Sequence, residues 1–164
     1  MKPINKWQIA LQDYRAQLNG LQGSLSEDSY QFFDEADLHD GELLDLQIVD
    51  GSRPGPISEP SRPWATMFSY PVKASLSVLD GQGQVVWRVS YRAMRRVAID
   101  FPTEDLLFHQ EGAGFGDWGY HELTDAGNGF LRHEVLFSSG AMLLFEFKEV
   151  AVNCVPRSSV PTPS

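Results

Sequence analysis

The chain has 164 residues, of which 42% are hydrophobic and 12% aromatic, and its formal net charge is −9. This composition is typical of one globular domain, and it excludes wholesale disorder, collagen and rod-like coiled coils. The single cysteine excludes a disulfide scaffold, and no apolar run approaches the ~20 residues of a membrane-spanning helix.

The first predicted elements are two helices. Apolar side chains recur at spacings of three and four over residues 4–21, which places them on one helical face. The members of this stripe are Ile4, Trp7, Leu11, Tyr14, Leu18 and Leu21. A second helix is predicted over residues 25–35, because Ser24 and Glu27 have the spacing of a capping box.

From residue 42 onward the hydrophobic pattern changes to the period of two that is typical of β-strands. Strands are predicted over 42–49, 70–78, 85–91, 97–101, 117–124, 129–137 and 141–152. Residues 51–63 are rich in Gly, Pro and Ser and predict a long loop. The order of elements indicates an α+β domain over residues 1–155, followed by a flexible tail over 156–164. In this fold two N-terminal helices pack on a mostly antiparallel sheet of about six strands, in two layers.

Turn sequences predict how neighbouring strands pair. A two-residue turn at residues 81–82 places Val78 opposite Val85, with both apolar sets on one face of the sheet. Pro71 indicates that its own strand lies at a sheet edge or begins there.

The three C-terminal strands bring polar residues together. An odd-length loop between the first two strands pairs His121 with His133 and Glu122 with Arg132. A three-residue loop between the next two pairs Arg132 with Glu146. Arg132 is therefore expected to lie between two carboxylates, in a charge ladder that stabilises the fold by a few tenths of a kcal/mol per pair if it is exposed.

Negative charge is concentrated in one interval. Between Arg15 and Arg53 the chain has no Lys or Arg and nine acidic residues. These are Glu27, Asp28, Asp34, Glu35, Asp37, Asp40, Glu42, Asp45 and Asp50. Such an interval disfavours binding to nucleic acid and favours a basic protein partner, with a merely solvated face as the alternative.

Aromatic residues in loop-like segments are candidate anchors for the same partner. They are Trp64, Phe115 and Trp118, and the alternative is that they fold back over the sheet. The glycine-rich segment 112–119 lacks the lysine and the following helix of a phosphate-binding loop. A basic cluster, expected to hold an anion, an acidic partner or the chain's own acids, comprises Arg88, Arg92, Arg95 and Arg96.

The histidines offer a second candidate site. Neighbouring imidazoles of His121 and His133 can bind a metal if His39, His109 or a carboxylate supplies a third ligand. No metal-binding motif accompanies them, so a hydrogen-bonded pair is the simpler interpretation and no cofactor is expected. His39 beside Asp40 resembles half of a catalytic relay, but adjacent residues on an extended chain point to opposite sides. No catalytic residue is therefore assigned.

Two segments resemble small bacterial proteins of unknown function. Residues 33–49, FDEADLHDGELLDLQIV, are similar to a helix-to-strand transition with the motif Leu-His-Asp-Gly/Ala in those proteins. Residues 119–150, GYHELTDAGNGFLRHEVLFSSGAMLLFEFKEV, are similar to their C-terminal half. Some of these proteins resemble immunity proteins of contact-dependent and polymorphic toxin systems. The resemblance implies an α+β intracellular domain and no catalytic residues.

Three hypotheses about function follow. The first is a non-catalytic, cytoplasmic binding protein that recognises a basic protein through the acidic 27–50 surface, as an immunity-like inhibitor would, centred on Asp34, Glu35, Asp37 and Asp40. The second is a small-molecule or metal-binding protein or enzyme built around His121 and His133. The third is a homodimeric interaction module. A nucleic acid or membrane partner is not expected, and the N-terminus does not have the features of a secretory signal.

Overall fold

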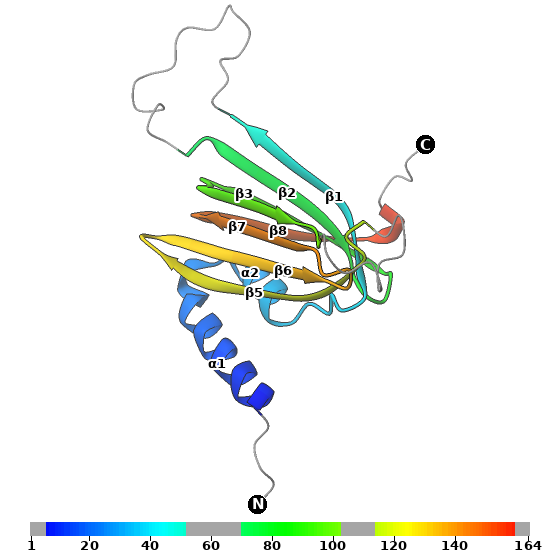
Figure 1. The fold of residues 1–164 in the computed structure, drawn as a ribbon, viewed down its shortest axis with the longest axis horizontal. Coiled ribbons are helices and arrows are strands. Elements are labelled where there is room, and N and C mark those ends of the chain that lie inside the picture. The colour runs from blue at the N-terminus through cyan, green and yellow to red at the C-terminus, as the bar shows by residue number, and fades with distance from the viewer. Residues whose placement is uncertain (1–5, 52–69, 103–113, 160–164) are drawn as a thin grey trace, which may run out of the picture.

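The structure is a computed structural model that describes residues 6–51, 70–102 and 114–159. Within these residues it has two α-helices followed by one antiparallel sheet of eight strands (Figure 1). The predicted α+β class is confirmed, whereas the expected number of about six strands is wrong. None of the helices in these ranges is long and apolar enough to cross a membrane.

The helices and strands follow one another in a simple order. The helices are α1 (Lys6–Leu21) and α2 (Glu27–Asp34), with the short 3-10 helix η1 (Gln22–Ser24) between them. The strands are β1 (Gly41–Asp50), β2 (Val72–Leu79), β3 (Val85–Arg92), β4 (Arg96–Asp100), β5 (Asp117–Gly127), β6 (Phe130–Phe137), β7 (Met142–Phe147) and β8 (Glu149–Pro156). Across the sheet they lie in the order β4-β7-β6-β5-β1-β2-β3-β8.

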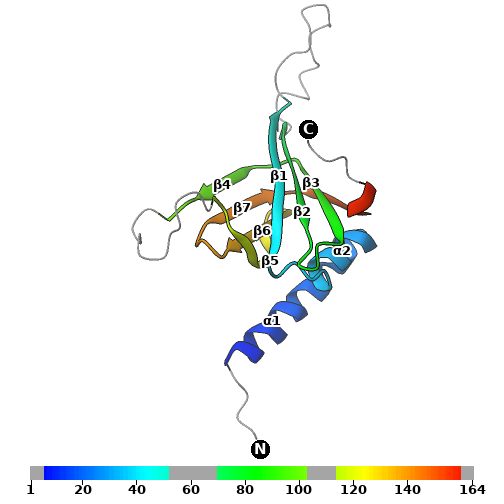
Figure 2. The ribbon, with the colours of Figure 1, turned by 90° about the vertical axis from the view of Figure 1, so that its right-hand side faces the viewer.

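The number of strands differs because the predicted strand 141–152 bends at Lys148 and changes partners. Before the bend, β7 pairs with β6 and β4, and after it β8 pairs with β3. The chain from β3 to β4 bends at the same level, where Ala93 has a left-handed φ of 51°. Between the two bends the Lys148 N–H donates to the Arg92 carbonyl at 3.3 Å. The two bent ribbons thus stay paired throughout, and the sheet curls (Figure 2).

Helix α1 packs against β5 through the predicted apolar stripe. Leu18 is fully buried, and the Leu123 N–H donates to the Tyr14 hydroxyl oxygen at 3.1 Å. This bond ties the middle of the helix to the sheet. Ile4 lies outside the described residues, as does the side chain of Trp7.

Helix α2 covers the inner face of the sheet, which is the face that carries the core residues. Ser26 caps this helix instead of the predicted Ser24, since the Ser26 hydroxyl accepts a hydrogen bond from the Ser29 N–H at 3.2 Å. Phe32 is fully buried, and its ring centroid lies 5.5 Å from that of Trp87 on β3. The helix is therefore joined to the sheet by aromatic packing.

The hairpin of β2 and β3 has a different turn from the predicted one. Val78 lies opposite Trp87 and not opposite Val85. Oδ1 of Asp80 accepts hydrogen bonds from two successive backbone N–H groups at the far end of the turn, at 2.7 and 3.2 Å. These bonds stabilise a loop over residues 81–84. Because the register differs by two residues, the same side chains still face the core.

The hairpin of β5 and β6 differs from its prediction in the same way. Asn128 and Gly129 form its turn, with left-handed φ angles of 55° and 79°. A bulge in β5 between residues 125 and 127 adds one residue beside that turn. His121 consequently lies opposite Val135, so the predicted direct pairing of the two histidines is wrong, although both remain on the inner face.

Strand β1 is less buried than its apolar sequence predicts. A bulge between Leu43 and Asp45 changes the alternation of side chains near its start. Leu46 is half-buried, while Leu44 and Ile48 are 44% and 47% exposed. The predicted apolar face of this strand is therefore only partly covered.

The C-terminal end of the domain is held beyond the predicted boundary. Pro156 lies opposite Val85, and residues Arg157–Ser159 form a short 3-10 helix, η3. The Arg157 N–H donates to the Gln84 carbonyl at 2.9 Å. The predicted flexible tail is thus packed on the hairpin of β2 and β3 up to this point, and residues 160–164 lie outside the described ranges.

Two leucines of neighbouring strands test this placement of the core. Leu76 is 1% exposed and Leu44 is 44% exposed. We expect Leu76→Ala to lower the free energy of unfolding by roughly 3 kcal/mol, because the substitution leaves a cavity in the core. Leu44→Ala is the control and should change it by less than about 1 kcal/mol. Urea unfolding followed by circular dichroism measures both, and equal effects would contradict the fold.

Candidate functional site

The nine acidic residues of the interval 27–50, which we call the acidic surface, all have exposed side chains. They lie on α2, in the connection over residues 35–40 and along β1. Glu27 and Asp28 stand in the first turn of α2, where they also stabilise the positive end of the helix dipole.

Most of this negative charge has no positive charge beside it. In the described parts of the chain, the acids from Glu27 to Asp45 form one ion pair, between Asp40 Oδ2 and His39 Nδ1 at 3.2 Å. None of the arginines or lysines described there pairs with them. The acidic surface is therefore available to an external cation.

The segment of His39 and Asp40 forms the turn that joins α2 to β1. Asp40 has a left-handed φ of 62°, and its N–H donates to the Trp118 carbonyl at 2.9 Å. A Cβ on Gly41 would lie 2.5 Å from the Leu79 carbonyl oxygen, so the position requires glycine. The side chains of His39 and Asp40 are 73% and 72% exposed. This turn thus presents an acid to solvent and does not form a buried catalytic relay.

The predicted aromatic anchors do not lie at the surface in the way the sequence indicates. Trp118 is 1% exposed, because it belongs to β5 and not to a loop, so its prediction as a surface anchor is wrong. Phe115 is half-buried and packs on Phe137, with ring centroids 4.9 Å apart. Trp64 lies outside the described residues. For the described pair, the alternative that they fold back over the sheet is correct.

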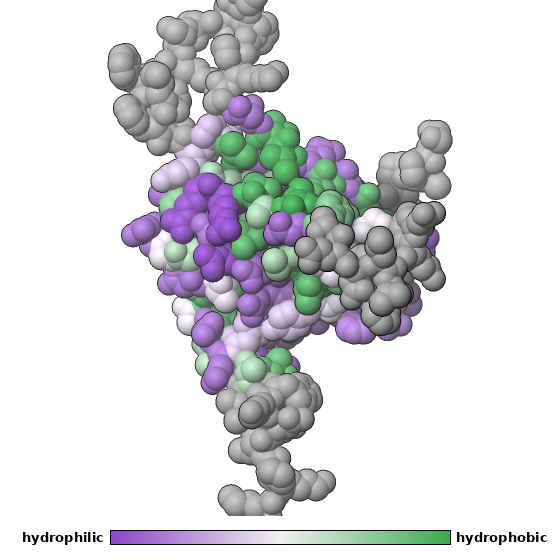
Figure 3. Space-filling view, viewed as in Figure 1, coloured by the Kyte–Doolittle hydropathy of each residue, from purple (hydrophilic) through white to green (hydrophobic). Residues whose placement is uncertain are grey.

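Apolar side chains on β1 take the place of those anchors beside the acidic surface. Leu44, Ile48 and Val49 are 44%, 47% and 46% exposed. Figure 3 shows hydrophobic surface along the course that β1 takes in Figure 1, with hydrophilic surface around it. Sequence reasoning missed this exposure, because alternation grouped Leu44 and Ile48 with Leu46 on one apolar face and left Val49 on the other.

The two candidate histidines belong to a hydrogen-bonded chain on the inner face. The Tyr91 hydroxyl lies 2.7 Å from His133 Nδ1, and His133 Nε2 lies 3.0 Å from His121 Nδ1. Tyr91 and His133 are fully buried, and His121 is partly exposed. The rings of Phe32 and Phe33 pack against both imidazoles.

One direction of hydrogen bonding satisfies all the buried groups of this chain. If the Tyr91 hydroxyl donates to His133, then His133 Nε2–H donates to His121, and the second nitrogen of His121 is left to solvent. The opposite direction leaves the buried Tyr91 hydroxyl without an acceptor, which is unfavourable. Both imidazoles are therefore neutral. Burial lowers the pKa of His121 to about 4, and burial with the charge of His121 places the pKa of His133 well below its usual value.

This arrangement is a packed polar chain and not an open metal centre. The described residues contain no group of three or more His, Cys, Asp and Glu that can hold a metal ion. His39 is at the exposed turn before β1, and His109 lies outside the described residues. The common face of the two histidines was predictable from the alternation of side chains, whereas the contribution of Tyr91 required its packing on Phe145 and Phe147 of β7.

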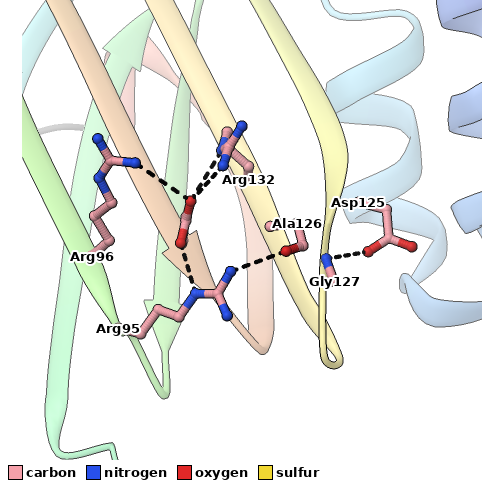
Figure 4. Close-up of polar contacts among 7 residues, drawn as sticks. Arg95, Arg96, Asp125, Ala126, Gly127 and Arg132 are labelled. Carbon is pink, nitrogen blue, oxygen red and sulfur yellow. Dashed lines mark hydrogen bonds and ion pairs between the residues drawn. The ribbon is translucent and has the colours of Figure 1, made fainter.

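A second polar cluster is centred on Glu146, which is 4% exposed (Figure 4). The predicted pairing of Arg132 with Glu146 is confirmed, with Arg132 Nη2 at 2.7 Å from Oε1. Arg95 Nε approaches Oε2 at 2.7 Å, and Arg96 Nη1 lies 3.8 Å from Oε1. The hydrogen bonds from Arg132 and Arg95 lower the pKa of Glu146.

The predicted arginine cluster and charge ladder are thus only partly right. Arg132 lies opposite Thr124 and not opposite Glu122, because of the bulge in β5. Arg95 and Arg96 pair with Glu146, whereas Arg88 and Arg92 stand exposed on β3. Arg95 also donates to the Ala126 carbonyl at 3.0 Å, so the cluster joins β4, β6, β7 and the end of β5.

No protein-family model, curated protein or solved structure matches this chain.

The buried histidines make stability depend on pH. Unfolded histidines have a pKa near 6.5, above the lowered folded values, so the unfolded state binds more protons as the pH falls. We expect the free energy of unfolding to decrease by roughly 2 kcal/mol per histidine between pH 7 and pH 5. Urea unfolding at several pH values measures the decrease. His39→Gln, which keeps both histidines of the polar chain, is the matched control and should retain this decrease. If the free energy of unfolding of the natural protein does not change with pH, the burial of His121 and His133 is contradicted.

Removal of the Glu146 charge should destabilise the fold. Glu146→Gln leaves Arg95 and Arg132 without their ionic acceptor, and we expect a loss of roughly 1.5–3 kcal/mol. Glu122→Gln is the matched control, with an expected change below about 0.5 kcal/mol. Thermal and urea unfolding measure both variants. A larger loss of stability in Glu122→Gln than in Glu146→Gln would instead support the predicted register, in which Arg132 lies opposite Glu122.

Proposed function

We propose that this protein is a non-catalytic binding protein that recognises a basic protein partner through the acidic surface of residues 27–50. The observation that carries the proposal is that the acids from Glu27 to Asp45 are exposed without an arginine or lysine partner among the described residues. Such a surface attracts a basic partner over several ångströms and orients it before contact. Inhibition of a basic enzyme or toxin, as by an immunity protein, is one activity that this binding would serve.

The distribution of the cations also supports this proposal. Arg95, Arg96 and Arg132 pair with Glu146, which leaves them unavailable to the acidic surface. An intramolecular neutralisation of that surface by the arginines, which is one alternative from the sequence, is therefore not supported.

The other two functions have weaker support. A small-molecule or metal site at His121 and His133 requires an open cleft, whereas Phe32 and Phe33 pack against both imidazole rings. A homodimer through the acidic surface would bring like charges together, which is unfavourable.

Reversal of charge on the acidic surface tests the proposal. The protein is immobilised, the captured basic protein is identified by mass spectrometry, and its affinity for the soluble chain is measured by calorimetry. The test variant is Asp34→Lys with Glu35→Lys and Asp37→Lys. Three attractions become repulsions, so we expect the dissociation constant to rise at least about tenfold. The affinity of the natural chain should also fall with added salt.

A second triple variant controls for net charge. Asp13→Lys with Asp100→Lys and Glu149→Lys makes the same change in charge at exposed positions outside the interval 27–50. We expect it to bind within about threefold of the natural chain. Equal binding by all three proteins, or equal losses in both variants, would contradict recognition through the acidic surface.

A further inference from the structure

Strand β1 has one open edge over most of its length. It pairs with β2 from Glu42 to Asp50, but its pairing with β5 is confined to Gly41 and Glu42. In Figure 1 the two strands share one end and then part, with β1 running toward the upper left and β5 running across the middle of the view, below the other strands. From Leu43 to Val49, none of the described residues forms a strand pair with this second edge of β1.

The backbone groups that face this open edge follow from the hydrogen-bond pattern. The Gly51 N–H donates to the Pro71 carbonyl at 3.1 Å, in continuation of the β1–β2 ladder. Alternate residues of an antiparallel strand turn their N–H and C=O toward the same neighbour. Residues 45, 47 and 49 therefore bond to β2, while the N–H and C=O groups of Leu46 and Ile48 point to the open edge.

This edge lacks the features that usually protect strands from pairing. Exposed edges commonly carry lysine, proline or a covering segment. The strand over residues 41–50 contains neither lysine nor proline, and it exposes Leu44, Ile48 and Val49. Its protective features are the bulge between Leu43 and Asp45, which leaves the regular stretch 45–50 beyond it, and the acidic side chains of the strand, Glu42, Asp45 and Asp50.

The charges indicate what kind of strand this edge accepts. A second copy of β1 would add three more acids, Glu42, Asp45 and Asp50, beside the same three of the first strand, so the two copies would repel each other. A basic strand would instead find Asp45 on one face and the apolar Leu46 and Ile48 on the other.

We propose that the basic partner adds an extended strand to the open edge of β1, with apolar residues next to Leu46 and Ile48 and Lys or Arg next to Asp45. This inference rests on the proposed function, since it specifies how the acidic surface is used. Main-chain hydrogen bonds to Leu46 and Ile48 supply affinity in this mode of recognition, and the alternating side chains supply selectivity.

Two synthetic peptides of equal charge test the pairing. The first alternates Val and Lys over eight residues and can form a strand, whereas the second alternates Pro and Lys and cannot donate from its prolines. NMR of the full chain with each peptide measures amide hydrogen exchange. We expect the Val-Lys peptide to slow exchange of the Leu46 and Ile48 amides at least about fivefold, and the Pro-Lys peptide to leave it unchanged.

Two variants of one residue separate the backbone from the side chain. Ile48→Pro removes an N–H that faces the open edge and leaves the bonds to β2 in place, which is a position where strands tolerate proline. Ile48→Ala removes the apolar side chain but keeps that N–H. We expect the Val-Lys peptide to bind Ile48→Pro at least about tenfold more weakly than Ile48→Ala. Melting curves check that both variants fold. If Ile48→Pro does not fold, the exchange measurement on the natural protein still tests the pairing.

The outcomes distinguish this inference from the proposed function. If both peptides bind equally and the Leu46 and Ile48 amides exchange as before, charge attraction remains and strand addition is overturned. If neither peptide binds, both proposals fail. If light scattering shows a dimer that Ile48→Pro dissociates, the edge accepts a second copy and the basic partner strand is overturned.

Discussion

The shape of this protein depends on the pairing of two bent segments, one running from β3 to β4 and the other from β7 to β8. The chain from β3 to β4 and the chain from β7 to β8 turn at the same level, and they remain hydrogen-bonded on both sides of the bend. This pairing places β4 and β8 at opposite ends of the sheet, although β4 directly follows β3 in the chain and β8 directly follows β7. The buried carboxylate of Glu146 holds the bend, because it binds Arg95 after β3 and Arg132 on β6. The curl that results separates most of β1 from β5.

The interior combines aromatic packing with one polar chain that orders it. Phe32 and Phe33 bring α2 onto the sheet, where they contact the imidazoles of His121 and His133. Buried polar groups are tolerated only when each donor finds an acceptor. The hydrogen bonds that join Tyr91, His133 and His121 meet this condition in one direction only. They therefore fix the tautomers of both histidines and the relative position of three strands. The lowered pKa values of both histidines follow from the same burial.

The same strand carries both the charge and the unpaired edge of the proposed binding surface. Acids on β1 and in the preceding turn oppose self-association of an edge that otherwise has the composition of an aggregating strand. They leave that edge open to a segment of opposite charge. In the proposed mode of binding, this negative charge opposes pairing between two copies of the exposed strand and selects a basic partner.

Local patterns in the sequence determined the class of the fold and the faces of its strands. Period-two alternation placed His121 and His133 on one face and predicted Arg132 beside Glu146, because both depend only on neighbouring strands. Turn details shifted two hairpins by two residues, since the carboxylate of Asp80 and the bulge before Asn128 act through contacts that composition does not reveal. The burial of Trp118, the recruitment of Arg95 and the open edge of β1 were decided by tertiary structure alone. Each of them depends on which distant segments the curled sheet brings together. Alternation along a single strand carries no information about how far that strand lies from other segments in space.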